Sequence, residues 1–91
     1  MMILPRKNDI IKHERFMDVA FEIRHIFGPY GPNDKYKVKG NWLNQGFINT
    51  YSLRYQQTLI IYRNDFCNWL ICDDPNIKCI RNSSWRKIKK D

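Results

Sequence analysis

Residues 35–39 read Lys-Tyr-Lys-Val-Lys, and this strict alternation restricts the fold more than any other stretch of the chain. A β-strand turns successive side chains to opposite faces, so the segment predicts a strand with one basic face and one apolar face. On the basic face, neighbouring ammonium groups would lie about 7 Å apart. They repel one another unless an anion lies near them. Since the chain carries a net charge of +7, the pattern predicts a polyanionic partner, most simply nucleic acid.

The length of 91 residues predicts a single domain, residues 1–91, with one modest core. The first seven residues lack the apolar core of a signal peptide, and the longest apolar run, Leu59–Tyr62, is too short to span a membrane. Both observations favour a cytoplasmic protein. The chain is rich in Ile, Asn, Lys, Tyr and Phe, which use A/T-rich codons, and this bias suggests a bacteriophage gene expressed in the cytoplasm of a host cell.

Residues 8–27 have apolar side chains at helical spacing, and Gly28-Pro29 would end such a helix. Residues 1–7 before it would form a flexible basic arm. The helix would carry two apolar patches, and the sheet of so short a chain covers one helix face well. The second patch therefore predicts an interface with a partner protein or, in a homodimer, with a second copy. Its residues are Ile10, Met17 and Phe21.

After the loop at residues 28–34 the apolar period changes from 3.6 to 2, which predicts strands. The expected strands span residues 36–42, 47–53, 58–63, 68–72 and 78–81, with bulges at Gly40 and Gly46. The predicted fold class is α+β, with one N-terminal helix packed on a curled antiparallel sheet or small barrel of four to five strands. The sheet would occupy a β meander over residues 35–88, followed by a basic tail at 86–91. This layout, with a Trp in its last segment, resembles the small curled β-barrels of the SH3 and OB kinds, a likeness of architecture that assigns no function.

Lysines and exposed aromatic rings on one surface would bind phosphates and stack on bases, respectively. The residues predicted to contact nucleic acid are Lys35, Lys37, Lys39, Trp42, Arg54, Tyr55, Arg81, Arg86 and Lys87. Because a strand suits an exposed single strand better than it suits a major groove, we expect RNA or single-stranded DNA.

Other chemistry has little support in the sequence. The spacing of Cys67, Cys72 and Cys79 does not suit zinc, and His13 and His25 would lie far apart on the predicted helix. No spacing indicates a Ser, His and Asp grouping. We therefore expect a protein that is not an enzyme and that holds no metal or other cofactor.

Two alternatives to nucleic-acid binding stay open. The first is a phage-type inhibitor that binds an acidic surface of a host protein, a counter-defence role. The second is a small-nucleotide-binding protein, in which residues 41–46 and 82–86 would form a pocket rich in amide and hydroxyl donors.

Overall fold

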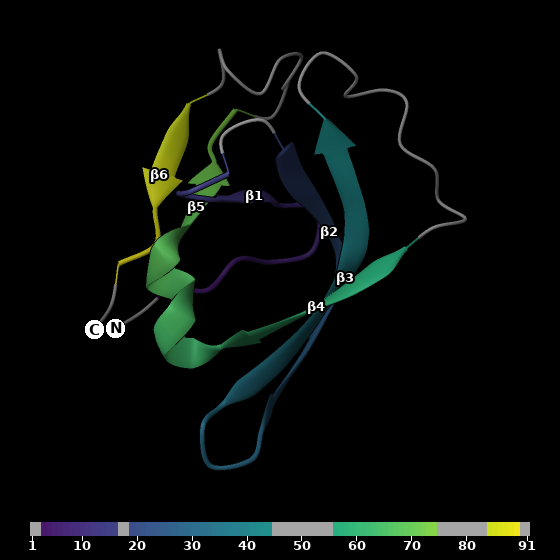
Figure 1. Ribbon diagram of the computed structural model, residues 1–91, viewed down its shortest axis with the longest axis vertical. Helices are drawn as coiled ribbons and strands as arrows, with labels where there is room; N and C mark the ends of the chain where they lie inside the picture. Colours follow the sequence, from purple (N-terminus) through teal and green to yellow (C-terminus); the bar gives the residue numbers. More distant parts are fainter. Residues whose placement is uncertain (1–2, 17–18, 45–55, 75–83, 90–91) are drawn as a thin grey trace.

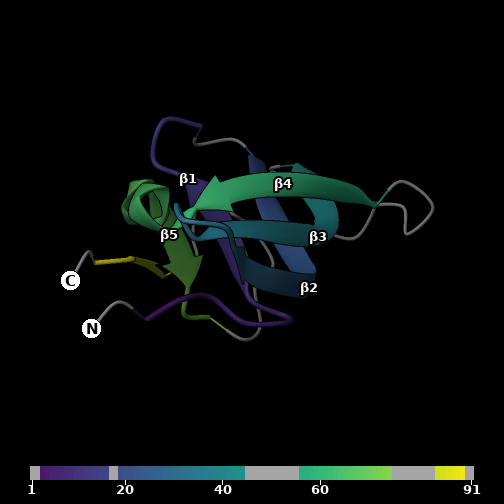
Figure 2. The same ribbon diagram turned by 90° about the horizontal axis from the view of Figure 1, so that it is seen from below.

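The computed structural model describes residues 3–16, 19–44, 56–74 and 84–89. These residues form a six-stranded sheet in the order β4-β3-β2-β1-β5-β6, and every pair of neighbouring strands is antiparallel (Figure 1). The strands are β1 (Ile10–His13), β2 (Val19–Tyr30), β3 (Lys35–Asn44), β4 (Gln57–Tyr62), β5 (Trp69–Cys72) and β6 (Trp85–Lys87). A 3-10 helix, Arg63–Asn68, connects β4 to β5. Seen from below, β2, β3 and β4 run side by side, and the 3-10 helix lies at the end of β4 beside β5 (Figure 2).

The predicted N-terminal helix over residues 8–27 is wrong, and with it the α+β fold class. Within this range the structure has β1 and most of β2, and the described residues contain no helix longer than the six-residue 3-10 helix. Phe21 and Ile23 are both fully buried although they are two residues apart, which is the spacing of a strand. Hydrogen bonding to β1 and β3 outweighs the helical spacing, since β-branched residues fit a pleated sheet well. The described residues contain no helix with the length and apolar character needed to cross a lipid bilayer.

The core lies inside the curl of the sheet. Its buried side chains come from every strand but β6 and from the 3-10 helix, with Ile88 following β6; they are Ile11, Phe21, Ile23, Tyr36, Val38, Ile61, Phe66, Ile71 and Ile88. Leu4 packs against this cluster, and Pro5 is also buried, so the segment predicted as a flexible arm is in contact with the core at Leu4. The backbone N–H of Asn8 donates to the carbonyl of Ile23 at 2.8 Å, which fixes the segment to β2.

The interface predicted on the helix is not an exposed patch in this fold. Phe21 is completely buried in the core, and Ile10 belongs to a second small cluster with Ala20 and Leu43. Met17 lies outside the described residues. A homodimer argued from an uncovered helix face therefore loses its basis, because the face does not exist.

Three of the predicted strands match β3, β4 and β5 to within two residues at each end. The strands expected at 47–53 and 78–81, and the bulge expected at Gly46, lie outside the described residues. β6 was not expected, since its residues were read as leading into a basic tail.

Two register shifts in β2 decide which of its side chains face the core. The first falls between Ile23 and His25, and the second between Phe27 and Tyr30. Gly40 lies opposite the first shift, where a Cβ atom would overlap the carbonyl oxygen of Glu22 and lie 2.9 Å from its carbonyl carbon. The sequence thus located a bulge at Gly40 correctly, although the extra residue, Arg24, belongs to β2. Each extra residue reverses the in-out alternation of the strand beyond it.

Candidate nucleic-acid interface

The alternation of residues 35–39 holds in the structure. Tyr36 and Val38 are buried on the core side of β3, whereas Lys37 and Lys39 are exposed on its outer side and Lys35 is half-buried there. β3 lies between β2 and β4, so each lysine has a cross-strand neighbour on both sides. Side chains directly opposite one another in an antiparallel pair share a face of the sheet.

The strand registers place an aromatic ring beside each lysine. On β2, Tyr30 pairs with Lys35, Phe27 with Lys37 and His25 with Lys39. On β4, the corresponding partners of the three lysines are Tyr62, Ile60 and Thr58. We call these nine side chains the lysine–aromatic face: His25, Phe27, Tyr30, Lys35, Lys37, Lys39, Thr58, Ile60 and Tyr62. A column of three rings therefore runs beside a column of three cations.

The rings and cations touch within this face. The Lys37 Nζ lies 5.8 Å from the centroid of the Tyr30 ring, and the Lys39 Nζ lies 5.7 Å from that of Phe27. Both distances suit a cation–π interaction. The His25 and Phe27 rings are stacked, with centroids 6.0 Å apart and planes 26° from parallel. Each of these two lysines thus lies over the ring that pairs with the next lysine along β3, and the rings stay open to solvent.

Exposed apolar surface is concentrated on this face. Tyr30 is 47% exposed, Ile60 48%, and Phe27 and Tyr62 each 42%. These are four of the six large hydrophobic side chains that are exposed among the described residues, the others being Ile3 and Phe16. Contiguous exposed apolar surface is a mark of binding sites.

Four cations elsewhere in the described residues are paired with carboxylates, whereas the lysines of this face are not. The Arg24, Arg63, Arg86 and Lys87 side chains form ion pairs with Glu22, Asp34, Asp73 and Glu14, at distances from 2.7 to 3.9 Å. Within the part of the chain that the structure describes, no such pair involves Lys35, Lys37 or Lys39. The face therefore combines positive charge that no carboxylate neutralises with aromatic rings that solvent reaches.

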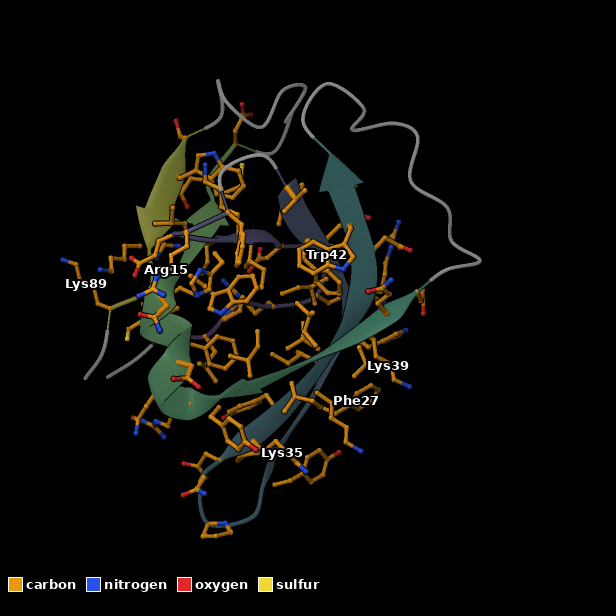
Figure 3. The ribbon with its side chains drawn as sticks, in the orientation of Figure 1. Arg15, Phe27, Lys35, Lys39, Trp42 and Lys89 are labelled. Atoms are coloured by element: carbon orange, nitrogen blue, oxygen red, sulfur yellow. The ribbon has the colours of Figure 1, made fainter. Side chains whose placement is uncertain are left out.

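The other residues predicted from the sequence lie elsewhere. Trp42 faces the core side of β3, where its ring meets Phe21 edge to face and its Nε1–H donates to Gln57 at 3.0 Å. Arg86 and Lys87 are on β6, at the far end of the strand order from β4. Arg54, Tyr55 and Arg81 lie outside the described residues. Figure 3 shows Phe27, Lys35 and Lys39 well separated from Arg15 and Lys89.

The sequence did not predict which residues lie opposite the lysines on this face, although Tyr30 was expected to be one of the aromatic residues near solvent. Phe27 was assigned to the apolar side of the helix, and Tyr30 to the loop that follows it. The available signal was the hairpin itself: a turn at residues 31–34 puts Tyr30 opposite Lys35. The first register shift turns His25 and Phe27 to the side of the lysines, the second does the same for Tyr30, and both leave only weak traces in the sequence.

One cavity of the described residues bears on the small-nucleotide alternative and gives it little support. This cavity, of about 580 Å³, lies beside β1, β5 and β6. The carboxylates of Asp9, Glu22, Asp73 and Asp74 outnumber the guanidinium groups of Arg6 and Arg86 in its lining, which disfavours a phosphate. Asn41, expected in a nucleotide pocket, is 2% exposed, and residues 45, 46, 82 and 83 of that predicted pocket are outside the described ranges.

The cysteines make short local contacts. The Cys67 thiol donates to the carbonyl of Asn64 at 3.1 Å, and the Cys72 thiol donates to the carbonyl of Asp74 at 3.7 Å. Over residues 3–16, 19–44, 56–74 and 84–89, no three His, Cys, Asp or Glu side chains are grouped so that they could hold a metal ion. Cys79 lies outside these ranges.

No protein family, curated protein or solved structure matches the chain.

Proposed function

We propose that this chain binds single-stranded nucleic acid, RNA or single-stranded DNA, through the lysine–aromatic face, without catalysis. The observation that carries the proposal is the strand register, which pairs each of three lysines on β3 with an aromatic ring on β2. Phosphates attract cations and bases stack on rings, so a single strand needs both groups side by side. A duplex hides the flat surfaces of its bases, and the rings would then have no partner.

The dimensions of the face suit such a ligand. Successive lysines on one side of a strand are about 7 Å apart, a spacing comparable to that of neighbouring phosphates in an extended single strand. The ring that pairs with each lysine lies on the adjacent strand, about 5 Å to the side. Each lysine–ring pair therefore offers one cation for a phosphate and one ring for the attached base. We expect the face to cover about three nucleotides.

An inhibitor of an acidic host protein would use the same lysines, and this alternative is the second candidate. It gives the exposed Phe27 and Tyr30 rings no specific partner, whereas nucleic acid does, so the structure favours nucleic acid over it. A phage accessory factor acting in the cytoplasm of a host cell is compatible with both functions.

The test replaces Lys35, Lys37 and Lys39 together by Gln and measures the fluorescence anisotropy of short labelled oligouridine and oligothymidine. With about 0.7 counterions released per phosphate contact in single strands, losing three contacts should flatten the plot of log K against log salt by about two units. The same arithmetic predicts affinity about 100-fold weaker near 0.1 M salt. The fold should persist, since exposed strand charges contribute little to stability.

The matched control replaces Lys7, Arg15 and Lys89 by Gln. It removes the same charge from exposed positions that are not part of the lysine–aromatic face and should leave both slope and affinity nearly unchanged. Equal losses in the two triple variants would show a general effect of net charge and would overturn the proposed site. Polyglutamate that competes as well as the oligonucleotides, charge for charge, would favour the acidic-protein alternative.

A further inference from the structure

β4 is an edge strand without the features that normally protect an edge. It has only β3 as a partner among the described strands. Its sequence, Gln-Thr-Leu-Ile-Ile-Tyr, contains no charge, no proline and no glycine. An edge strand presents unpaired N–H and C=O groups along its length, and natural proteins usually guard such edges with Lys, Pro, bulges or short length.

The opposite edge of the same sheet is guarded in this way. β6 has three residues, and two of them are Arg86 and Lys87. Both side chains are exposed, and their charges would repel an identical strand. The contrast between the two edges of one sheet indicates that β4 is kept free of charge so that it can pair with another strand.

We propose that β4 pairs with β4 of a second copy of this chain, in antiparallel orientation about a two-fold axis. The pairing needs one edge per copy, so it closes after two copies and gives a dimer instead of a fibre. It would also cover two of the most exposed apolar side chains of the described residues, Ile60 and Tyr62. This inference does not depend on nucleic-acid binding.

The alternation of β4 restricts the register of the pairing. Thr58, Ile60 and Tyr62 share the outer face with the lysines, whereas Ile61 is buried on the core side. A two-fold axis perpendicular to the sheet must pair outer residues with outer residues. Axes on Leu59 and on Ile60 both pair five residues of β4, and only the axis on Ile60 includes both Ile60 and Tyr62 in the paired segment, with Ile60 opposite Ile60 of the second copy. Tyr62 then lies opposite Thr58, an aromatic and β-branched pair that is favourable across strands.

Charge does not oppose this dimer strongly. β3 of one copy and β3 of the other would be separated by both β4 strands, which puts the two lysine columns about 14 Å apart. That separation exceeds the screening length of about 8 Å at physiological salt. A second copy is a better pairing partner than an unrelated peptide, because every copy of this chain carries a β4 strand of equal length and without charge. The dimer would join two lysine–aromatic faces into one continuous surface.

Sedimentation velocity of the full chain over a range of micromolar concentrations tests the proposal. We expect a dimer for the wild type and a monomer for Ile60→Lys, in which two like charges would meet on the axis. Because Ile60 is 48% exposed, the variant should stay folded, which its circular dichroism spectrum will check. Phe16→Lys is the matched control: Phe16 is 61% exposed and follows β1, which is three places from β4 in the strand order, so that variant should remain a dimer.

A cysteine on the axis tests the register directly. Opposite residues of an antiparallel pair have Cα atoms about 4.5–5.5 Å apart, within the range that a disulfide bridges. Ile60→Cys should therefore form a covalent dimer on mild oxidation, with the bridge located by peptide mapping. Thr58→Cys should not, since the two copies of residue 58 would be about 14 Å apart. A wild type that sediments as a monomer throughout, or an Ile60→Lys variant that stays dimeric, would overturn the proposal.

Discussion

Replacing Gly40 by Ala should destabilise the fold more than its single added methyl group suggests. Gly40 is buried on β3 and lies opposite the first register shift of β2. An added Cβ would overlap the carbonyl oxygen of Glu22, and it would lie 3.0 Å from Cε2 of Phe21. The obstructing atoms belong to backbone and to a fully buried ring, so neither can move aside without moving β2.

The cost follows from the hydrogen bonds that a separation of the strands would break. A buried backbone group left without a partner costs about 1–3 kcal/mol. Losing one donor and one acceptor beside the bulge gives about 4 kcal/mol, a large part of the 5–15 kcal/mol that holds a typical domain together. For a chain of this size, that loss should lower the melting temperature by about 15–30 °C.

Urea denaturation followed by tryptophan fluorescence will measure this loss, because the Trp42 ring packs on Phe21 beside Gly40. Gly31→Ala is the matched control. Gly31 has φ of +72°, but nothing lies within 4 Å of an added Cβ, so that variant should lose only about 1–2 kcal/mol of conformational energy. If Gly40→Ala is no less stable than Gly31→Ala, the close approach of β2 and β3 at this bulge is wrong.

Two further substitutions separate binding from stability. Phe27→Ala should weaken oligonucleotide binding about 5–150-fold, since one base–ring stack contributes about 1–3 kcal/mol. Anisotropy that matches the wild type would remove this ring from the site. Lys12→Met should stabilise the protein near neutral pH. Lys12 is 3% exposed, and burial lowers the pKa of its amine. The Trp85 ring, whose centroid is 4.4 Å from the amine, offsets this cost only in part. The unfolded chain binds the Lys12 proton more tightly than the folded chain does. The wild-type free energy of unfolding should therefore rise with pH between the lowered pKa of Lys12 and the ordinary pKa of lysine. Urea titrations that show an equal rise in Lys12→Met would contradict this.

The strands around the lysines could be predicted because the signal is local. The alternation of Lys35, Lys37 and Lys39 with Tyr36 and Val38 fixes both the strand and its two faces. No neighbouring strand has to be known for this, since the period of 2 belongs to the backbone itself. β4 and β5 were found on similar grounds, as short apolar runs between turns.

β2 was mistaken for part of a helix because a bulged strand imitates helical spacing. The inward positions Phe21, Ile23 and Ile26 are separated by two residues and then by three, since Arg24 is the extra residue of the bulge. Spacings of three and four are what a helix shows on one face. A single sequence cannot reveal the bulge, because its cause, the close approach of β2 to Gly40, is a tertiary contact.

The same register shifts explain why the charge of the candidate site was predictable and its rings were not. Without the extra residue Arg24, the alternation that directs Phe21 and Ile23 inward would also direct His25 and Phe27 inward. The lysines of β3 would keep their face in either case, because their alternation contains no bulge. Gly40 therefore influences both the fold and the candidate site. By admitting the bulge it lets the chain curl around its core, and it turns the rings of β2 toward the side of the sheet where the lysines lie.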